Sequence, residues 1–266
     1  MTARAAAFFD LDKTIIAKSS VLAFGKSLYR EGLLSRRAIV RSAYAQVIFM
    51  LVGADEDKME KLRGAMLDMI RGWNQHEVAA IVREALDEVV TPIIFSEALD
   101  LIEEHQQAGR LVVIVSSAPE EVVRPLGEFL GVDDVIATRA DVDAHGNYTG
   151  ELAFYGYGPF KAEAIKDYAA REGLELSESY AYSDSVTDAP MLQTVGNPVA
   201  VNPDRELARL ARDEGWPILK FVRPVRLRDR LSVPSRPVLV VTGALTAAGA
   251  SALVWWWLHR RERAPA

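Results

Sequence analysis

Short runs of apolar residues alternate, along most of the chain, with longer stretches in which apolar residues recur every three or four positions. Continuous apolar runs are typical of strands buried in a sheet, and the periodic stretches are typical of helices with one apolar face. The predicted strands are Ala5–Phe9, Leu111–Val115, Val135–Ala137, Tyr180–Tyr182 and Val199–Val201. The predicted helices between them are Ser96–Gln107, Glu120–Leu130, Phe160–Arg171 and Pro190–Thr194. This alternation predicts an α/β fold with a doubly wound parallel sheet.

Residues 17–95 interrupt the alternation, because they contain no convincing strand. Helical periodicity runs through four stretches, Val21–Arg30, Ser35–Val52, Asp55–Arg71 and Glu77–Val89. We therefore predict an all-helical cap inserted after the first strand, with residues 1–16 and 96–219 forming the α/β core. Such an insert would lie over the edge of the sheet at which open α/β folds bind ligands. A second departure, Ala137–Phe154, predicts a small hairpin turning at His145-Gly146-Asn147.

The C-terminal part of the chain has the pattern of a membrane anchor. Residues 238–258 are 21 residues without a charged side chain, enough for a helix across a hydrocarbon core of roughly 30 Å. Residues 255–257 are three tryptophans, which favour the headgroup boundary. The alternative is a buried core helix, which would leave these tryptophans and the flanking arginines unexplained.

A basic neck, residues 220–237, precedes this segment, and a basic tail, residues 259–266, follows it. The neck has six basic residues against Asp229: Lys220, Arg223, Arg226, Arg228, Arg230 and Arg236. Because positive charge stays on the cytoplasmic side, we expect a single transmembrane helix with the preceding domain in the cytoplasm. The apolar stretch after Met1 is too short for a signal peptide.

Composition narrows the function classes. Half of the residues are apolar and the chain has no cysteine, which excludes intrinsic disorder, disulfide scaffolds and thiolate chemistry. The formal net charge of −6 argues against nucleic acid as a partner. The four histidines show no metal-ligand spacing, and we expect each at the surface or in a loop.

The first predicted strand ends in Phe8-Phe9-Asp10-Leu11-Asp12-Lys13-Thr14. Two carboxylates two residues apart at a strand end lie close together, so they either bind a cation or separate into one ionised and one protonated group. That separation suits a nucleophile beside a general acid. Alternatively, the pair is only a polar strand end with a local turn.

Three further segments place polar side chains at the same predicted edge. Ser116 and Ser117 follow the second strand, and Ser117 also fits a helix N-cap. Lys161 begins a helix after a glycine-rich aromatic loop. Asp184 and Asp188 follow the fourth strand and offer the hard oxygen ligands that Mg²⁺ prefers, although Asp188 alone could be a helix cap.

The ordered set DLDKT, VSS, K and SDSVTD resembles the haloacid dehalogenase superfamily of phosphate-transferring hydrolases. The helical insert after the first motif is similar to that of its phosphoserine phosphatase-like subfamily IB. The resemblance covers residues 5–215 and implies a Rossmann-like core and phosphatase activity.

The resemblance also implies roles for individual residues. Asp10 would attack phosphorus and form an aspartyl-phosphate, and Asp12 would protonate the leaving group and then activate water. Mg²⁺ would be held by Asp10, the Asp12 carbonyl, Asp184 and Asp188. Ser116, Ser117, Lys161 and Thr14 would form the phosphate-binding set, with Thr14 also bracing its loop.

Two departures from the family pattern bear on specificity and metal binding. The fourth motif has Ser183 and Thr187 where Gly and Asn are usual, although both acids remain. Ser19 stands where phosphoserine phosphatases have a glutamate that contacts the substrate ammonium, so phosphoserine is a doubtful substrate. Lys18 and Arg30 would favour an anionic leaving group if they faced the pocket.

These residues support three hypotheses. The leading one is a Mg²⁺-dependent phosphomonoesterase tethered to the cytoplasmic face of a membrane, with a lipid phosphate or head-group phosphate as substrate. The second is a phosphatase of phosphoserine or another soluble phosphometabolite. The third, from a different class, is a non-catalytic, membrane-anchored phosphate-binding module.

Overall fold

The computed structural model describes residues 4–33 and 56–222. All of the described residues belong to one compact unit, and residues 230–266 lie outside them. The predicted helix Ser35–Val52, the segment 238–258, the tail 259–266 and nearly all of the neck therefore stay predictions. Within the described ranges, the helices are too short or too polar to cross a membrane.

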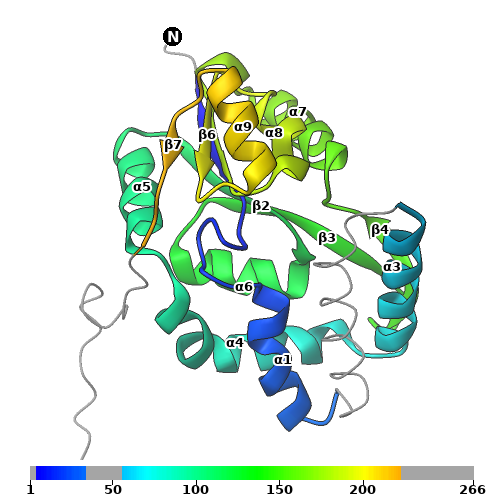
Figure 1. The fold of residues 1–266 in the computed structure, drawn as a ribbon. Coiled ribbons are helices and arrows are strands. Elements are labelled where there is room, and N and C mark those ends of the chain that lie inside the picture. The colour runs from blue at the N-terminus through cyan, green and yellow to red at the C-terminus, as the bar shows by residue number, and fades with distance from the viewer. Residues whose placement is uncertain (1–3, 34–55, 223–266) are drawn as a thin grey trace, which may run out of the picture. The chain divides into compact units, whose positions relative to one another are not determined.

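The described chain is built on a seven-stranded sheet with the order β4-β3-β2-β1-β5-β6-β7. The strands are β1 (Ala6–Phe9), β2 (Leu111–Pro119), β3 (Asp134–Val142), β4 (Tyr148–Phe154), β5 (Tyr180–Ser183), β6 (Asn197–Val201) and β7 (Ile218–Leu219). All neighbours are parallel except β3 and β4, which form the predicted hairpin. The parallel α/β sheet is thus confirmed, with β1 at its centre (Figure 1).

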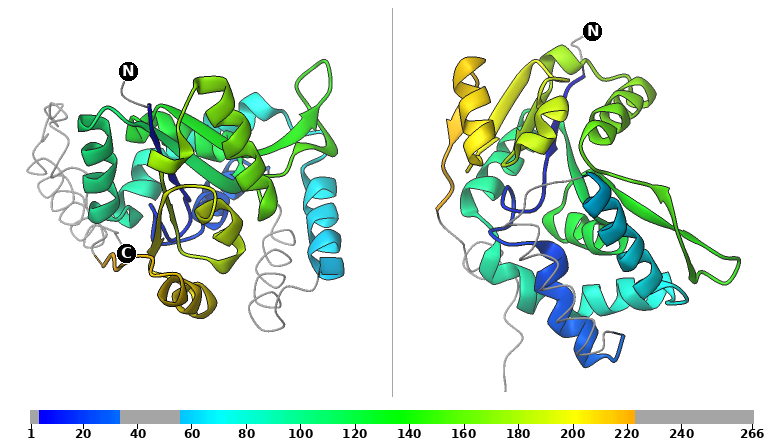
Figure 2. Two further views of the ribbon diagram at one scale, coloured as in Figure 1. Left: turned by 90° about the horizontal axis from the view of Figure 1, so that it is seen from above. Right: turned by 45° about the vertical axis from the view of Figure 1, so that its right-hand side comes forward.

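Helices cover both faces of the sheet (Figure 2). They are α5 (Ser96–Gln107), α6 (Glu120–Leu130), α7 (Pro159–Glu172), α8 (Ala189–Leu192) and α9 (Arg205–Asp213), with short 3₁₀ turns at Leu176–Glu178 and Val186–Asp188. One apolar cluster contains residues of α5 and α6, and the other contains residues of α7, α8 and α9. Each face of the sheet therefore has its own core, as expected when strands are apolar on both sides.

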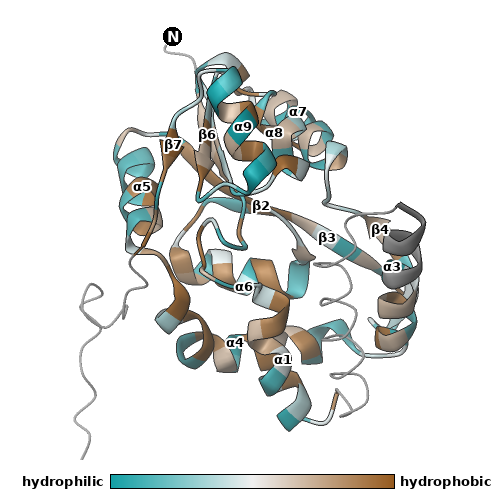
Figure 3. Ribbon diagram, viewed as in Figure 1, coloured by the Kyte–Doolittle hydropathy of each residue, from teal (hydrophilic) through white to brown (hydrophobic). Residues whose placement is uncertain are grey.

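The described part of the insert after β1 is helical: α1 (Ser20–Arg30), α3 (Glu56–Ile70), α4 (Gln75–Val90) and a 3₁₀ turn at Thr91–Ile93. Helix α4 packs against both α1 and α6. Phe24 of α1 and Val82 of α4 belong to the same apolar cluster as Val123 of α6. Figure 3 shows the brown, apolar positions along α1 and α4, and teal ones over α5 and α9. The cap and the core thus share one interior.

The tip of the β3–β4 hairpin also holds the cap. The Tyr148 N–H donates to the Trp73 carbonyl at 2.9 Å, and the Gly72 N–H donates to the Tyr148 carbonyl at 2.9 Å. Asn74 and Asn147 form an isolated bridge between the same two segments. The cap is therefore fixed to the core at a point far from both of its connections in the sequence.

Two local predictions were wrong. Strand β2 continues four residues past its predicted end, because its pairing with β3 carries on through Ser116 and, after an irregularity, Pro119. Helix α6 accordingly takes Pro119 as its N-cap residue, so Ser117 does not cap it.

His105 was predicted at the surface and is instead buried, with 3% of its area exposed. Its Nε2 lies 2.8 Å from the Tyr182 hydroxyl, and Arg110 lies 3.3 Å from its Nδ1. An arginine can only donate, so Nδ1 is the acceptor and the ring is neutral with its proton on Nε2. Burial, aided by the Arg110 charge, lowers the pKa of His105 to about 4.

This histidine should make the fold sensitive to acid. The unfolded chain takes up the proton near pH 6.5, whereas the folded chain takes it up near pH 4. The contribution of His105 to the free energy of unfolding is therefore complete above pH 6.5. It is lost as the pH falls toward 4, by about 3 kcal/mol at most. Urea unfolding at pH 7 and 4.5 measures the loss. His105→Gln should show a smaller loss over the same range, and equal losses in both proteins would contradict the assignment.

Candidate active site

The carboxyl ends of β1, β2 and β5 bring the predicted site residues to one edge of the sheet. Phe9 of β1 pairs with Ile114 of β2 and with Tyr182 of β5. The Asp10 N–H continues the ladder by donating to the Tyr182 carbonyl at 2.9 Å. Asp10 and Asp184 therefore follow the ends of β1 and β5 at nearly the level of Ser116, which lies within β2.

The chain turns sharply after Asp10. Lys13 has a left-handed backbone (φ 62°), and its N–H donates to the Ile16 carbonyl at 2.6 Å. The Ile15 N–H donates back to the Leu11 carbonyl at 2.9 Å. This closed turn keeps Asp12 beside Asp10 instead of letting the chain run on as a strand.

Lys161, near the start of α7, is the centre of the site. Its Nζ lies 2.7 Å from Asp10 Oδ1 and 2.8 Å from Asp188 Oδ2, and only 2% of the residue is exposed. Burial disfavours its charged form, but the two carboxylates outweigh that effect and raise the pKa of Lys161. The lysine is therefore a fixed ammonium shared by two buried acids.

Ser183 and Asp188 form the second half of this network. The Ser183 hydroxyl donates to Asp188 Oδ2 at 2.7 Å, the same oxygen that receives Lys161. Asp188 occupies the N-cap position of α8, but its side chain makes no capping hydrogen bond. Its carboxylate is thus committed to the site and not to the helix.

Asp184 is also buried, and the Nζ of the exposed Lys13 lies 3.7 Å from its Oδ2. Burial raises the pKa of Asp184 to about 6, with Lys13 opposing and Asp188 reinforcing the shift. Burial likewise raises the pKa of Asp10, against the nearby Lys161 ammonium. Acidic charge in this site therefore exceeds what the buried lysine offsets.

Asp12 is half-buried, and its Oδ1 accepts the Ser20 N–H at 2.8 Å. Burial raises its pKa, and the hydrogen bond from the Ser20 main chain is the largest opposing effect. The Lys161 charge also lowers the pKa of Asp12 slightly, so the second acid of the motif lies within electrostatic reach of the network.

The predicted phosphate-binding serines differ in placement. Ser116 is buried, and its Oγ accepts the Ala118 N–H at 3.1 Å. Ser117 is exposed, and its carbonyl accepts the Thr138 hydroxyl at 2.8 Å. The structure therefore places the side chain of Ser116 in the interior and that of Ser117 outside it.

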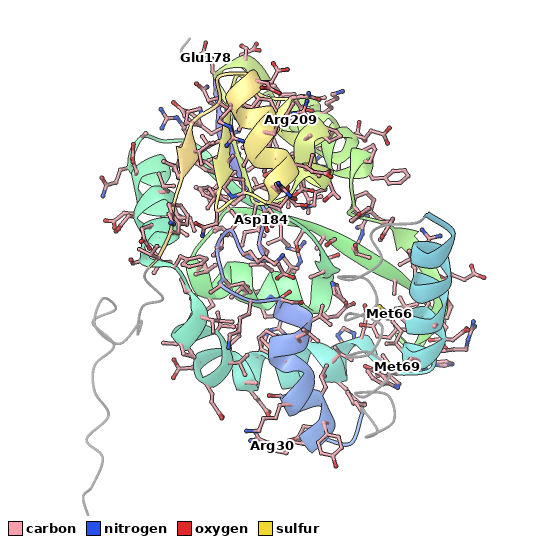
Figure 4. All side chains as sticks on the ribbon, in the orientation of Figure 1. Arg30, Met66, Met69, Glu178, Asp184 and Arg209 are labelled. Carbon is pink, nitrogen blue, oxygen red and sulfur yellow. The ribbon has the colours of Figure 1, made fainter. Side chains whose placement is uncertain are left out.

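Thr14 is fully buried, but its hydroxyl has no hydrogen-bond partner among the described residues. The predicted bracing of the loop by this hydroxyl stays a prediction. Lys18 is exposed, and Arg30 is an exposed residue with Glu31 4.0 Å away. Figure 4 shows Arg30 at the far end of α1 from Asp184, so Arg30 does not face the site.

Two contributors were missed by reasoning from sequence. Asp204 Oδ2 accepts the Val186 N–H at 2.9 Å, and the Asp204 N–H donates to the Asp184 carbonyl at 2.7 Å. Asp204 thereby holds the loop between the two motif acids while capping α9. The helix-start pattern at residues 204–207 could have revealed it. For Ser183, only its departure from the family pattern was a signal.

A metal site is not preformed in the side chains that the structure describes. No three acidic, histidine or cysteine side chains in that part of the chain are grouped closely enough to hold an ion by themselves. Lys161 lies between Asp10 and Asp188 and keeps their inner oxygens occupied. The site instead offers two separate buried carboxylates, Asp10 and Asp184.

The model of the haloacid dehalogenase-like hydrolases matches residues 7–193, which include every acid of the network. The chain belongs to this family. The match covers β1, the cap and all four motif segments, and it confirms the family resemblance. Subfamily IB stays a prediction.

Relatives extend the likeness over nearly the whole chain. The "Inhibition of morphological differentiation protein" of Streptomyces azureus is 57% identical, over 97% of this chain and 95% of that protein. A "Probable phosphatase" of Mycobacterium tuberculosis (strain H37Rv) is 52% identical, over 97% of this chain and 90% of that protein. A phosphoserine phosphatase of the same strain is 37% identical, over 93% and 80%. This haloacid dehalogenase-like hydrolase is thus a phosphatase, and a purely non-catalytic module is not supported.

Solved structures agree on the fold. A protein of unknown function from Bordetella pertussis gives a TM-score of 0.72 at 29% identity, over 82% of this chain and 99% of that one. A phosphoserine phosphatase holding a phospho-aspartyl intermediate analogue gives a TM-score of 0.57 at 19% identity, over 86% of this chain and 97% of that one. The second likeness concerns the fold alone.

Gly156 should be essential for the shape of the site. A Cβ at this position would lie 2.7 Å from the Ser116 carbonyl oxygen and 3.3 Å from the Thr138 nitrogen. Gly156→Ala should therefore displace Ser116 and lower kcat by on the order of tenfold, because sub-ångström misplacement weakens catalysis. Gly25→Ala in α1, whose Cβ meets nothing within 4 Å, is the control. Steady-state phosphate release measures both, and equal activities would contradict the steric argument.

Proposed function

We propose that this haloacid dehalogenase-like phosphatase hydrolyses phosphate monoesters through an aspartyl-phosphate on Asp10. The observation that carries the proposal is the buried Lys161 ammonium, 2.7 Å from Asp10 Oδ1 and 2.8 Å from Asp188 Oδ2. A carboxylate that is buried beside a fixed cation is oriented and partly desolvated, which are two requirements of a nucleophile that attacks an anion.

Charge explains why a cation must stand beside the nucleophile. A carboxylate and a phosphate oxyanion about 4 Å apart repel by about 4 kcal/mol at an effective dielectric constant near 20. Lys161 reverses part of that repulsion and is placed to stabilise charge on the transferring phosphoryl oxygens. Ser116, buried within β2, is the proposed hydroxyl partner of the same group.

The carboxylates whose charge Lys161 does not offset are suited to bind Mg²⁺. Mg²⁺ is usually held by one or two carboxylates, substrate oxygens and waters, and does not require a cage made of protein alone. Asp10 and Asp184 are buried acids with raised pKa values, and with the Asp12 carbonyl they form the proposed ligand set, Asp188 supporting it. When bound, the ion would neutralise phosphate charge as the nucleophile approaches.

Asp12 is the proposed general acid and base. In the first half-reaction a bond forms between an Asp10 oxygen and phosphorus while the bond between phosphorus and the ester oxygen breaks. Asp12 donates a proton to the departing ester oxygen. In the second, Asp12 takes a proton from water, which attacks phosphorus and releases Asp10 and inorganic phosphate. Burial raises the pKa of Asp12, which favours holding the proton that the leaving group needs.

We further propose that the domain is tethered to the cytoplasmic face of a membrane by residues 238–258 and acts on a lipid phosphate or head-group phosphate. The uncharged segment and its basic flanks support this. A soluble phosphometabolite is the alternative, and a 37% identical phosphoserine phosphatase favours it. Against phosphoserine, Ser19 provides no carboxylate for a substrate ammonium.

Asp10→Asn should abolish turnover, because an amide is a poor nucleophile toward phosphorus, while the near-isosteric side chain keeps the fold. Phosphate release from an aryl phosphate with and without Mg²⁺ measures turnover, and acid-quenched labelling with ³²P-phosphate ester detects the aspartyl-phosphate. Glu163→Gln, on the exposed side of α7, is the control for a lost carboxylate. Wild-type turnover by Asp10→Asn would refute the mechanism.

The full chain should float with vesicles of uncharged phosphatidylcholine, whereas the truncation 1–236, which keeps the basic neck but lacks residues 238–258, should stay in the aqueous fraction. Both should release phosphate from a soluble aryl phosphate at similar rates, since the described site lies within residues 4–222. A panel pairing vesicle-borne lipid phosphates with soluble esters, L-phosphoserine included, then compares the two proteins. A full chain that stays soluble would contradict the tether, and faster hydrolysis of L-phosphoserine would favour the alternative.

A further inference from the structure

The first helix of the cap makes direct contact with the proposed general acid. The Ser20 N–H donates to Asp12 Oδ1 at 2.8 Å, across eight residues of sequence. Ser20 is the first residue of α1 and is fully buried. The hydrogen bond is partly buried and joins the catalytic turn to the start of the cap.

The residues at the start of α1 do not cap the helix themselves. Helices leave their first N–H groups free, and a serine at the N-cap usually accepts one of them. Ser19 holds the N-cap position, but its side chain makes no capping hydrogen bond, and the first turn has no acidic residue. Asp12, from outside the helix, supplies the negative oxygen that the helix start favours.

We infer that the main-chain N–H of Ser20 is the positioning group for Asp12, so that the cap's first helix holds the carboxylate that transfers the proton. The inference rests on the proposed function. It adds a group outside the four motifs to the reaction and makes the start of the cap part of the catalytic apparatus, beyond any role in covering the substrate.

The neighbouring backbone shows why such a group is needed. Asp12 lies in a closed turn, in which Lys13 is left-handed and residues 12 and 16 form an isolated bridge. The turn fixes the main chain of Asp12 but not its carboxylate. The Ser20 N–H is the strongest of the hydrogen-bond donors that residues 19 and 20 offer this carboxylate, and proton transfer depends steeply on the position of the donor oxygen.

Ser20→Pro removes this N–H, and the local backbone can accept the ring. Proline is favoured at the first position of a helix, where it has no intrahelical hydrogen bond to lose. Proline also requires an extended residue before it, and Ser19 is extended with φ −65° and ψ 126°. Ser20→Val is the matched control, since it adds a similar volume and keeps the N–H. Ser20→Ala removes only the hydroxyl.

The readout is the dependence on the leaving group. An alkyl alcohol leaves poorly without a proton, whereas a nitrophenol leaves readily, so only the alkyl ester needs a well-placed acid. Ser20→Pro should lower kcat/KM for an alkyl phosphate by about tenfold to a hundredfold, and for p-nitrophenyl phosphate by less than about threefold. Ser20→Val and Ser20→Ala should keep the wild-type ratio of the two values. Asp12→Asn gives the limiting ratio.

A second variant removes the N–H without a ring: an ester linkage in place of the amide between Ser19 and Ser20. It should shift the ratio in the same direction as Ser20→Pro, and it decides the matter if the proline variant does not fold. An unchanged ratio in the variants that lack the N–H, or an equal shift in Ser20→Val, would overturn the inference. Either result leaves the proposed function intact, because that depends on Asp10→Asn and the labelled intermediate.

Discussion

The ammonium of Lys161, shared between Asp10 and Asp188, is the constraint on which the site depends. It joins the end of β1 to the loop after β5 through a side chain on α7. Two buried carboxylates without a partner would cost several kcal/mol each, so this placement is enforced by energetics as well as by chain geometry. The same cation that makes the acids tolerable in the interior also makes the approach of a phosphate tolerable. Stability and function therefore use one interaction here.

The sequence allowed the architecture and the four motif segments to be predicted, because both depend on local patterns. The bounds of α5 and α6 follow directly from periodic apolar positions and from polar residues at each end. Asp10, Lys161 and Asp188 lie together because parallel strands end at one edge of the sheet. What local patterns cannot give is the partner of each side chain, which tertiary packing decides.

The errors have that origin. Ser117 looked like a helix cap, but pairing with β3 keeps the chain extended through it. His105 looked like a surface residue on a polar helix, but its ring packs among Phe9, Tyr180 and Tyr182. Ser183 was recognised only as a departure from the family pattern, and its hydrogen bond to Asp188 could not be foreseen. For Ser117 and His105, contacts distant in sequence outweighed the local preference.

The shared interior of cap and core limits how this protein can diversify. Helix α4 lies against α6, and Phe24, Val82 and Val123 belong to one apolar cluster. An insert transplanted from a relative would have to present an apolar surface complementary to α6. Excision of the insert would expose the apolar face of α6 to water. Chimeras made by exchanging whole inserts should therefore aggregate unless α6 is exchanged with them. New substrate preference in such a scaffold is more readily reached by single replacements beside the site.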